Sequence, residues 1–225
     1  MKISGLEKLT LTDFPGNLAA IVFTQGCNYR CSFCQNSTLL DNDDGLLDEN
    51  YIMEYLEKRK NVLEGLVITG GEPTLQKDLK EFIKKVRKLG LKIKLDTNGS
   101  NYLVLEDLLK ENLLDYVAMD IKTTFDKYED IVGLKVNTTN IKKSIKLLKE
   151  SNIDYEFRTT IVKEFHDLDT IKEIIKIVDG SKYFLQNYQD SENVLDRSLH
   201  SFSNEELQDI NKAIKKFPNV KIRNL

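Results

Sequence analysis

The sequence predicts an α/β fold, specifically a partial (βα)6 TIM-like barrel that is open on one side. Two observations lead to this prediction. Short apolar runs rich in β-forming residues alternate about six times with segments whose apolar residues follow helical spacing. Six such units are two short of a closed eight-unit barrel, and 225 residues suit one compact domain. We therefore expect a single core domain over residues 1–225.

The expected strands are apolar runs that end at polar or turn-forming residues. They cover residues 18–24, 66–69, 91–95, 116–119, 155–162 and 183–185. The carboxyl ends of parallel strands form one face of such a fold, and binding sites gather there. Residues that directly follow these strands are therefore the first candidates for a functional site.

Helices are expected between the strands. Apolar residues at helical spacing predict helices over residues 52–63, 79–89 and 168–178. Ser203, followed three residues later by Glu206, is a capping-box pattern and predicts the start of the last helix.

Composition excludes several classes of protein. Hydrophobic residues make up 40% of the chain and charged residues 31%, with 3 Pro and 11 Gly, which excludes a disordered or collagen-like chain. A net charge of −3 gives no basic field for nucleic acid. Because no run approaches the ~20 apolar residues of a membrane span and no signal-peptide pattern opens the chain, we expect a cytoplasmic protein without a disulfide framework.

All three cysteines lie within eight residues, at Cys27, Cys31 and Cys34, in the loop 25–36. This clustering predicts that the thiolates bind one soft metal centre. Structural zinc usually has four ligands, and neither His166 nor His200, which we interpret as surface residues, is close in sequence. A 4Fe–4S cluster fits better, because three cysteines leave one of its irons open for an exogenous ligand.

The spacing Cys-x3-Cys-x2-Cys, with Phe33 just before the last cysteine, resembles the signature of the radical S-adenosylmethionine superfamily. The resemblance implies a partial barrel and one 4Fe–4S cluster held by the three cysteines. It also implies that the amino and carboxylate groups of S-adenosylmethionine chelate the open iron. Phe33 would lie against the adenine of this cofactor.

The second expected strand ends in Gly70, Gly71, Glu72 and Pro73. Alone, this segment is typical of an ordinary turn between strand and helix. After the cysteine triplet, it resembles the GGEP motif of the same superfamily. By that resemblance the main chain of Gly70 and Gly71, together with Glu72, holds the amino group of S-adenosylmethionine. A carboxylate suits an ammonium group, because the hydrogen bond between them is charge-assisted.

The next two strand ends also carry polar residues. Asp96 opens an Asp-Thr-Asn-Gly segment, and alternation places Asp120 and Lys122 on one side of the chain. Taken alone, these are typical of a turn and a surface ion pair. Both segments resemble those of activating enzymes of glycyl-radical proteins, which implies that Asp96, Asp120 and Lys122 line the pocket around the cofactor's methionine and ribose.

The fifth strand places Glu156 and Arg158 on one of its faces. If this face is turned inward, Arg158 can meet a carboxylate at the cofactor site. A solvent-facing pair explains the pattern equally well. Gln186 to Tyr188, at the end of the sixth strand, are weaker candidates.

Three further segments resemble one particular group of these activating enzymes. Residues 13–16 (Asp-Phe-Pro-Gly), residues 23–28 and the pair Gln35-Asn36 resemble the activating proteins of anaerobic ribonucleoside-triphosphate reductase. The resemblance implies reductive cleavage of S-adenosylmethionine to a 5′-deoxyadenosyl radical, which then generates a glycyl radical on that reductase or on another glycyl-radical enzyme. It also implies a flavodoxin- or ferredoxin-like electron donor. Gln35 departs from the histidine that many such activators have.

Two other interpretations remain open. A small enzyme similar to 7-carboxy-7-deazaguanine synthase would act on a pterin-like substrate, but such enzymes tend to have Trp and Asp where this chain has Phe33 and Gln35. From another class, the chain would be a non-catalytic iron–sulfur protein or a zinc-binding module. In that case the GGEP and Asp-x-Lys segments would be coincidences.

Overall fold

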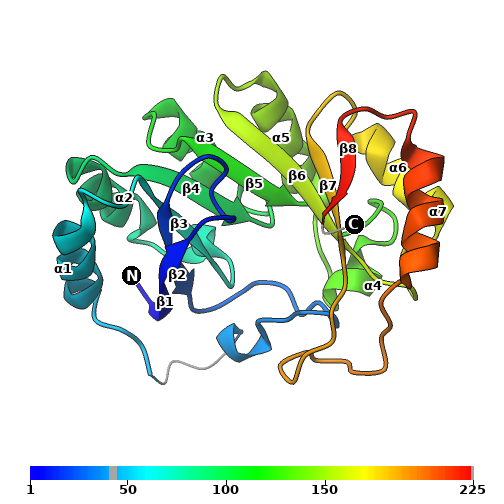
Figure 1. Cartoon of the computed structure of the whole chain (residues 1–225), viewed down its shortest axis with the longest axis horizontal. Helices are drawn as coiled ribbons and strands as arrows, with labels where there is room; N and C mark the ends of the chain where they lie inside the picture. Colours follow the sequence, from blue (N-terminus) through cyan, green and yellow to red (C-terminus); the bar gives the residue numbers. More distant parts are fainter. Residues whose placement is uncertain (41–44, 224–225) are drawn as a thin grey trace. The chain divides into compact units, whose positions relative to one another are not determined.

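The computed structural model describes residues 1–40 and 45–223. Its strands form one sheet whose order follows the chain, from β1 to β8 (Figure 1). β1 runs antiparallel to β2, and the pairs β2–β3, β3–β4, β6–β7 and β7–β8 are parallel. The strands are β1 (Ile3–Thr10), β2 (Ala19–Thr24), β3 (Gly65–Gly70), β4 (Lys92–Thr97), β5 (Tyr116–Asp120), β6 (Asp154–Ile161), β7 (Tyr183–Asn187) and β8 (Val220–Arg223).

Helices connect most of these strands. The α-helices are α1 (Glu49–Arg59), α2 (Leu79–Lys88), α3 (Tyr102–Lys110), α4 (Tyr128–Val132), α5 (Thr138–Glu150), α6 (Leu168–Ile177) and α7 (Asn204–Ile214), with short 3-10 helices η1 (Ser37–Leu39) and η2 (Pro73–Leu75). The predicted capping box is present at the start of α7, where Ser203 and Glu206 bond reciprocally. No helix in the described part of the chain is long and apolar enough to cross a membrane.

The predicted fold class is confirmed. The six expected strands are β2 to β7, and in the described residues the sheet order ends at β8 without closing onto β1. The sequence prediction missed the two outermost strands. β1 was not predicted because its sequence lacks regular apolar alternation, which agrees with its half-buried or exposed middle residues. β8 has only four residues, two of them charged.

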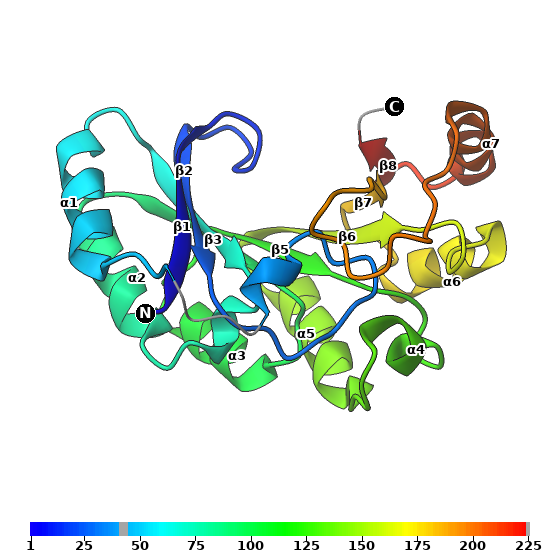
Figure 2. The same cartoon turned by 90° about the horizontal axis from the view of Figure 1, so that it is seen from below.

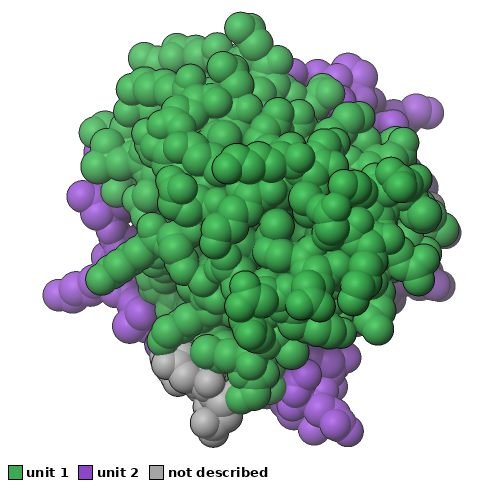
Figure 3. All heavy atoms as spheres, turned by 90° about the vertical axis from the view of Figure 1, so that its left-hand side faces the viewer, with its two compact units in different colours: residues 1–28, 38–118, 140–154 green, residues 29–37, 119–139, 155–225 purple. Residues whose placement is uncertain are grey.

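The chain divides into two compact units, coloured separately in Figure 3. Unit 1 comprises residues 1–28, 38–118 and 140–154, and unit 2 comprises residues 29–37, 119–139 and 155–225. The cysteine loop is therefore shared, since Cys27 belongs to unit 1, whereas Cys31 and Cys34 belong to unit 2. One core domain over residues 1–225 stays a prediction.

In unit 1 the strands β2, β3 and β4 pair in parallel, with Ala19 opposite Gly65 and Gly65 opposite Lys92. Figure 2 shows α1, α2 and α3 along one face of these strands. The helix α2 buries Leu79, Phe82 and Ile83 in this layer. Because the strands are in register, their ends come together at one edge, where the loops after β2, β3 and β4 meet.

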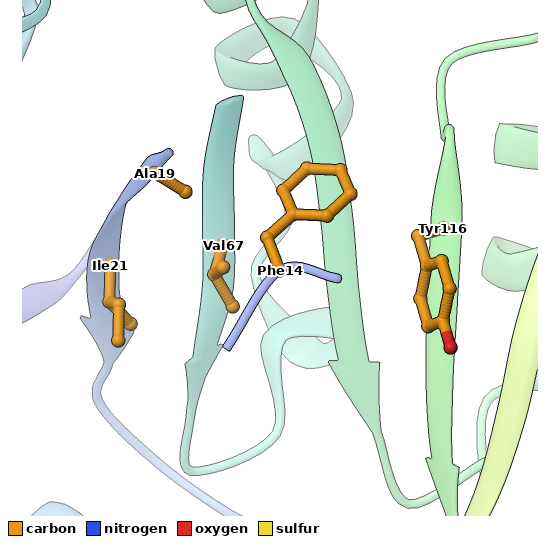
Figure 4. Packing of buried hydrophobic residues seen from close by; sticks show 5 residues of the cluster. All are labelled: Phe14, Ala19, Ile21, Val67 and Tyr116. Atoms are coloured by element: carbon orange, nitrogen blue, oxygen red, sulfur yellow. The ribbon is translucent and has the colours of Figure 1, made fainter. Parts of the chain in front are cut away.

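The opposite face of the unit 1 strands is filled by Phe14, from the Asp-Phe-Pro-Gly segment. Its ring is 2% exposed and lies 6.2 Å from the ring of Tyr116 in an edge-on arrangement. Figure 4 shows it beside Ala19, Ile21 and Val67, the other members of this cluster. The segment that the sequence analysis treated as a family marker therefore forms part of the hydrophobic core.

In unit 2 the strands β6, β7 and β8 pair in parallel. Buried side chains of neighbouring strands form polar contacts with one another. The Tyr183 hydroxyl of β7 donates to Thr159 Oγ1 of β6 at 2.7 Å. Glu156 is 1% exposed and forms an ion pair with Arg223 at 2.6 Å. Of the two alternatives for this face of β6, Glu156 therefore follows the inward-facing one and is not exposed to solvent.

Candidate cofactor site

The glycine pair at the end of β3 is required by the close approach of the segment that leads to the first cysteine. A Cβ at Gly71 would lie 2.0 Å from the carbonyl oxygen of Gly26, and Gly70 has a φ of +112° that disfavours any side chain. The Gly71 and Glu72 amides donate to the carbonyl oxygens of Thr24 and Gly26 at 2.9 and 2.8 Å. The GGEP segment is thereby bound to the residues that directly precede Cys27.

Glu72 is fully buried, and its carboxylate accepts hydrogen bonds from residues at the ends of two strands, β3 and β4. Oε1 accepts from the amide and hydroxyl of Thr74 at 3.1 and 2.5 Å and from the Thr97 hydroxyl at 2.7 Å. Oε2 accepts from the Asn98 amide at 2.7 Å. Burial raises the pKa of the Glu72 carboxyl, and the hydrogen bonds from Asn98, Thr74 and Thr97 oppose this rise. Its carboxylate therefore joins the turns after β3 and β4.

Asp96 forms an ion pair with Lys94, two residues earlier on the same face of β4. The Lys94 side chain is 2% exposed, and its Nζ lies 6.0 Å from the centre of the Tyr116 ring. Sequence reasoning missed Lys94, because the alternation Lys92-Ile93-Lys94 is typical of a solvent-facing strand edge. A buried lysine that neutralises Asp96 leaves less negative charge for a cationic ligand than the sequence suggested.

In unit 2 the predicted residues Asp120, Lys122 and Arg158 come together. Asp120 Oδ2 lies 3.1 Å from Lys122 Nζ, and Asp120 Oδ1 lies 2.9 Å from Arg158 Nε. Burial alone would raise the pKa of Asp120, but the charges of Arg158 and Lys122 lower it to about 2. Burial opposes the charged form of Lys122 as well, yet attraction to Asp120 and Cys31 raises its pKa above the usual value. All three groups are charged at neutral pH.

Phe33 packs beside this charged group. Its ring is 4% exposed, and its centre lies 6.0 Å from Lys122 Nζ and 6.4 Å from the ring centre of Phe165. Between the cysteines on either side, the Cys34 amide donates to the Cys31 carbonyl oxygen at 3.0 Å. The second and third cysteines thus share one tight turn, and Phe33 is one of its residues.

His166 is a correction to the sequence analysis, which placed it on the surface. It is 0% exposed, Nδ1 accepts the Val162 amide hydrogen at 3.0 Å, and Nε2 donates to the Lys122 carbonyl oxygen at 2.8 Å. Burial lowers its pKa, so that the neutral ring with its hydrogen on Nε2 is favoured. His200 is exposed, as expected, and forms a 2.7 Å contact with Glu164.

Sequence reasoning also missed Tyr128. Its hydroxyl accepts the Lys122 amide hydrogen at 3.1 Å, and its ring is fully buried. With His166 on the carbonyl side and Tyr128 on the amide side, both main-chain polar groups of Lys122 are bound. No sequence signal indicated this, because α4, where Tyr128 lies, has only five residues.

The end of β7 has a structural role. Asn187 and Phe202 exchange two hydrogen bonds, from Asn187 Nδ2 to the Phe202 carbonyl oxygen at 2.9 Å and from the Phe202 amide to Asn187 Oδ1 at 3.0 Å. Gln35, the residue that departs from histidine, donates to the carbonyl oxygen of Gln189 at 2.9 Å. Both side chains therefore hold loops of unit 2 in place.

The residues present fit a cluster and an anionic ligand by their chemistry. Cys27, Cys31 and Cys34 are not joined in disulfides. In the described chain, the buried hydroxyls of Ser32 and Thr123 have no hydrogen-bond partner, and they directly follow Cys31 and Lys122. Within residues 1–40 and 45–223, no three His, Cys, Asp or Glu side chains are already gathered as a metal-binding group. The assignment of the three cysteines as ligands stays a prediction.

Comparison with known proteins gives the family. The model of the radical SAM superfamily matches residues 21–178, more than half of the chain. A protein of Methanocaldococcus jannaschii, provisionally named a glycyl-radical enzyme activating enzyme, is 35% identical over 99% of this chain and 96% of its own.

Other relatives match over shorter stretches. The pyruvate formate-lyase-activating enzyme of Clostridium pasteurianum is 32% identical over 59% of this chain and 57% of its own. The GTP 3′,8-cyclase of Helicobacter pylori strain J99 is 28% identical over 78% of this chain and 56% of its own. This chain therefore spans a little over half the length of these two relatives.

Solved structures agree on the fold. SuiB of Streptococcus suis, solved with S-adenosylmethionine, gives a TM-score of 0.70 at 18% identity over 88% of this chain and 48% of its own. QueE of Escherichia coli gives 0.60 at 15% identity over 98% of this chain and 92% of its own. Cysteine spacing, sheet topology and family match agree, and this chain belongs to the radical SAM superfamily.

Proposed function

We propose that this protein activates a glycyl-radical enzyme by removing a hydrogen atom from a glycine Cα of that partner. The observation that carries the proposal is the 35% identity, over nearly the whole of both chains, with the archaeal protein provisionally named for this activity. The relative that activates pyruvate formate-lyase supports it as well. Anaerobic ribonucleoside-triphosphate reductase is the first partner to test, because residues 13–16, 23–28 and 35–36 resemble its activators.

The cofactors follow from the family. A radical SAM protein implies a 4Fe–4S cluster and S-adenosylmethionine, and we infer that Cys27, Cys31 and Cys34 ligate three irons. When bound and reduced, the cluster supplies the electron that cleaves S-adenosylmethionine to methionine and a 5′-deoxyadenosyl radical. The protein would ligate the cluster, orient S-adenosylmethionine and exclude water from the site.

The charges of unit 2 support a role in binding the cofactor's carboxylate. Lys122 and Arg158 both contact Asp120, so that two cationic side chains lie beside one carboxylate. The side chains of Lys122 and Arg158 are 16% and 13% exposed. Two neighbouring cations with so little exposure to solvent favour an anionic ligand. We propose that Lys122 and Arg158 take the carboxylate of S-adenosylmethionine, with the ring of Phe33 against its adenine.

The GGEP segment is proposed to bind the amino group of the cofactor. Gly70, Gly71 and Glu72 would hold the ammonium group, and Asp96 would lie near the ribose. Four internal donors fix the Glu72 carboxylate in one orientation. An ammonium group beside it would favour its charged form and offset the effect of burial on its pKa.

The test is a hydrogen-transfer experiment. The protein, reconstituted without oxygen with iron and sulfide and then reduced, is mixed with S-adenosylmethionine and a reductase whose glycines carry deuterium at Cα. We expect a glycyl-radical signal by electron paramagnetic resonance and deuterium in the 5′-deoxyadenosine by mass spectrometry. A reductase with Ala at the radical glycine is the matched control, and it should give neither.

The outcomes separate the partner from the enzyme class. Cleavage of S-adenosylmethionine without deuterium transfer would exclude this reductase as the substrate and leave the family chemistry intact. Parallel incubations with a pterin-like substrate and with GTP test the small-molecule alternatives, and turnover of either would replace the proposal. Supplying reduced flavodoxin or reduced ferredoxin in place of the chemical reductant identifies the class of electron donor.

A further inference from the structure

The residue after the first cysteine is bound to the turn that follows β4. Asn28 Oδ1 accepts from Asn98 Nδ2 at 2.9 Å, and Asn28 Nδ2 donates to Ser100 Oγ at 2.8 Å. Asn98 Oδ1 accepts the Ser100 amide hydrogen at 2.9 Å. Each of the two amide groups uses both its donor and its acceptor. A rotation of either amide by half a turn would place like atoms together, so the contact fixes one orientation.

The turn itself is rigidly anchored. The amide of Asn98 and the hydroxyl of Thr97 both donate to the buried carboxylate of Glu72. From the other side, Ser144 Oγ of α5 donates to the Gly99 carbonyl oxygen at 2.8 Å, and Asn140 Nδ2 donates to that of Ser100 at 3.1 Å. Asn28 is therefore bonded to a turn held from two directions.

The residue before Cys27 is fixed as well, by main-chain contacts. The Gly26 amide donates to the Leu39 carbonyl oxygen at 2.7 Å, and the Gly26 carbonyl oxygen accepts from the Glu72 amide at 2.8 Å. Cys27 thus lies between a main-chain clamp on Gly26 and a side-chain clamp on Asn28. Both clamps lead back to Glu72, through its amide on one side and its carboxylate on the other.

We propose that Asn28 and Asn98 are positioning residues for the first cluster-binding cysteine. Their amide pair holds the main chain at Cys27 in the conformation that presents its thiol, and Glu72 acts on the cluster through Asn98. This gives Glu72 a second role beside the proposed contact with the ammonium group. Only the effect on cluster binding rests on the proposed function. The hydrogen bonds that hold Cys27 can be tested in the metal-free chain.

The first experiment measures the alkylation of each thiol in the metal-free protein. A half-buried thiol is alkylated faster when its segment opens more often, so the rate at Cys27 reports local opening. Removing the two hydrogen bonds of the Asn98 side-chain amide should raise the alkylation rate at Cys27 on the order of tenfold. Iodoacetamide labelling of Asn98→Ala, followed by peptide mass spectrometry, gives this rate, with Cys34 as the internal reference.

Asn101→Ala is the matched control. Asn101 lies three residues from Asn98, and its side-chain amide donates to the Thr74 carbonyl oxygen at 2.8 Å, a hydrogen bond that does not involve residues 26–28. It should leave the rate at Cys27 unchanged. Asn28→Ala tests the exposed partner of the pair, where loss of folding is not expected. Asn28→Asp keeps the acceptor for Asn98 and loses the donor to Ser100, and it should fall between wild type and Asn28→Ala.

The second experiment uses the reconstituted protein. The rate at which a chelator bleaches the cluster should rise in Asn28→Ala and Asn98→Ala and stay at the wild-type value in Asn101→Ala. If wild type takes up no cluster, the proposed function fails while the thiol measurement still decides the clamp. Equal alkylation of Cys27 in Asn98→Ala, Asn28→Ala and Asn101→Ala would overturn the inference.

Discussion

Asp120 is bound on both oxygens by cations, and its ionisation should contribute to stability in a defined pH range. Its pKa of about 2 in the folded chain lies below its usual value of 3.8. A lowered pKa contributes stability that is present above pH 4 and is lost as the pH falls from about 4 toward 2.

We predict that Asp120→Asn lowers the free energy of unfolding by about 1–3 kcal/mol at pH 7, because Lys122 and Arg158 lose their charged partner. Urea unfolding between pH 3 and pH 7 is the measurement. The variant should lose less stability than wild type as the pH falls below 4. Parallel curves for the two proteins would contradict this account of the trio.

His166 should produce a separate effect near neutral pH. Its pKa is lowered from 6.5 by burial, so the unfolded chain takes up a proton at a pH where the folded chain does not. Stability must then decrease as the pH falls below 6.5. We predict a steeper fall in melting temperature from pH 7 to pH 5 in wild type than in His166→Gln, since glutamine offers a donor and an acceptor but does not titrate. His200 is present in both proteins, so an equal slope would exclude His166 as the source.

At the scale of the elements, the end of α4 shapes the loop between the first two cysteines. Gly133 ends this helix with a φ of +68°, and a Cβ there would lie 2.8 Å from the Arg30 carbonyl oxygen. The Arg30 amide in turn donates to the Val132 carbonyl oxygen at 2.8 Å. A helix of only five residues therefore supports the main chain beside Cys31.

Gly133→Ala should be more harmful than the same change at Gly180, which is left-handed too (φ +79°) but has no atom within 4 Å of the added Cβ. Both variants incur about 1–2 kcal/mol of left-handed strain. Only Gly133→Ala must also move Arg30, and we expect at least 1 kcal/mol more from this contact. Urea unfolding gives the two losses, and iron content after reconstitution should fall in Gly133→Ala alone. Equal losses would show that the contact at Arg30 is unimportant.

At the scale of the molecule, the core of unit 1 depends on a ring from a loop. Phe14→Ala should lower the free energy of unfolding by about 3–5 kcal/mol, because a buried aromatic ring is removed from between Gly65 and Tyr116. Leu11→Ala, at a side chain 75% exposed in the same loop, should change it by less than about 0.5 kcal/mol. Chemical denaturation compares them, and similar small losses would mean that the ring is replaceable.

Much of this architecture could be predicted from sequence because its signals are local. Apolar runs and helical spacing located β2 to β7, and the Ser203 pattern located the start of α7. Strand alternation placed Asp120 beside Lys122 and Arg158 beside Glu156, but the contact between Arg158 and Asp120 was found only in the structure. The fold class was therefore within reach of short-range patterns.

What could not be predicted depends on which strands lie side by side. Asn28 and Asn98 are seventy residues apart, and their amide pair exists only because the ends of β2, β3 and β4 meet. Lys94 alternates like a surface residue and is buried by neighbours distant in sequence. His166 belongs to no motif, and its role depends on the Lys122 carbonyl oxygen 44 positions earlier. Such contacts require the register of the whole sheet.

The antiparallel strand β1 also bears on self-association. A parallel sheet that began at β2 would offer an unpaired row of amides and carbonyls to any second molecule. β1 occupies that row, and its own outer edge is a poor template: its pairing is irregular at two places, and Glu7 and Lys8 are exposed there. Charge and irregular pairing discourage a further strand from adding. We therefore expect this edge of the sheet to oppose aggregation of the metal-free chain.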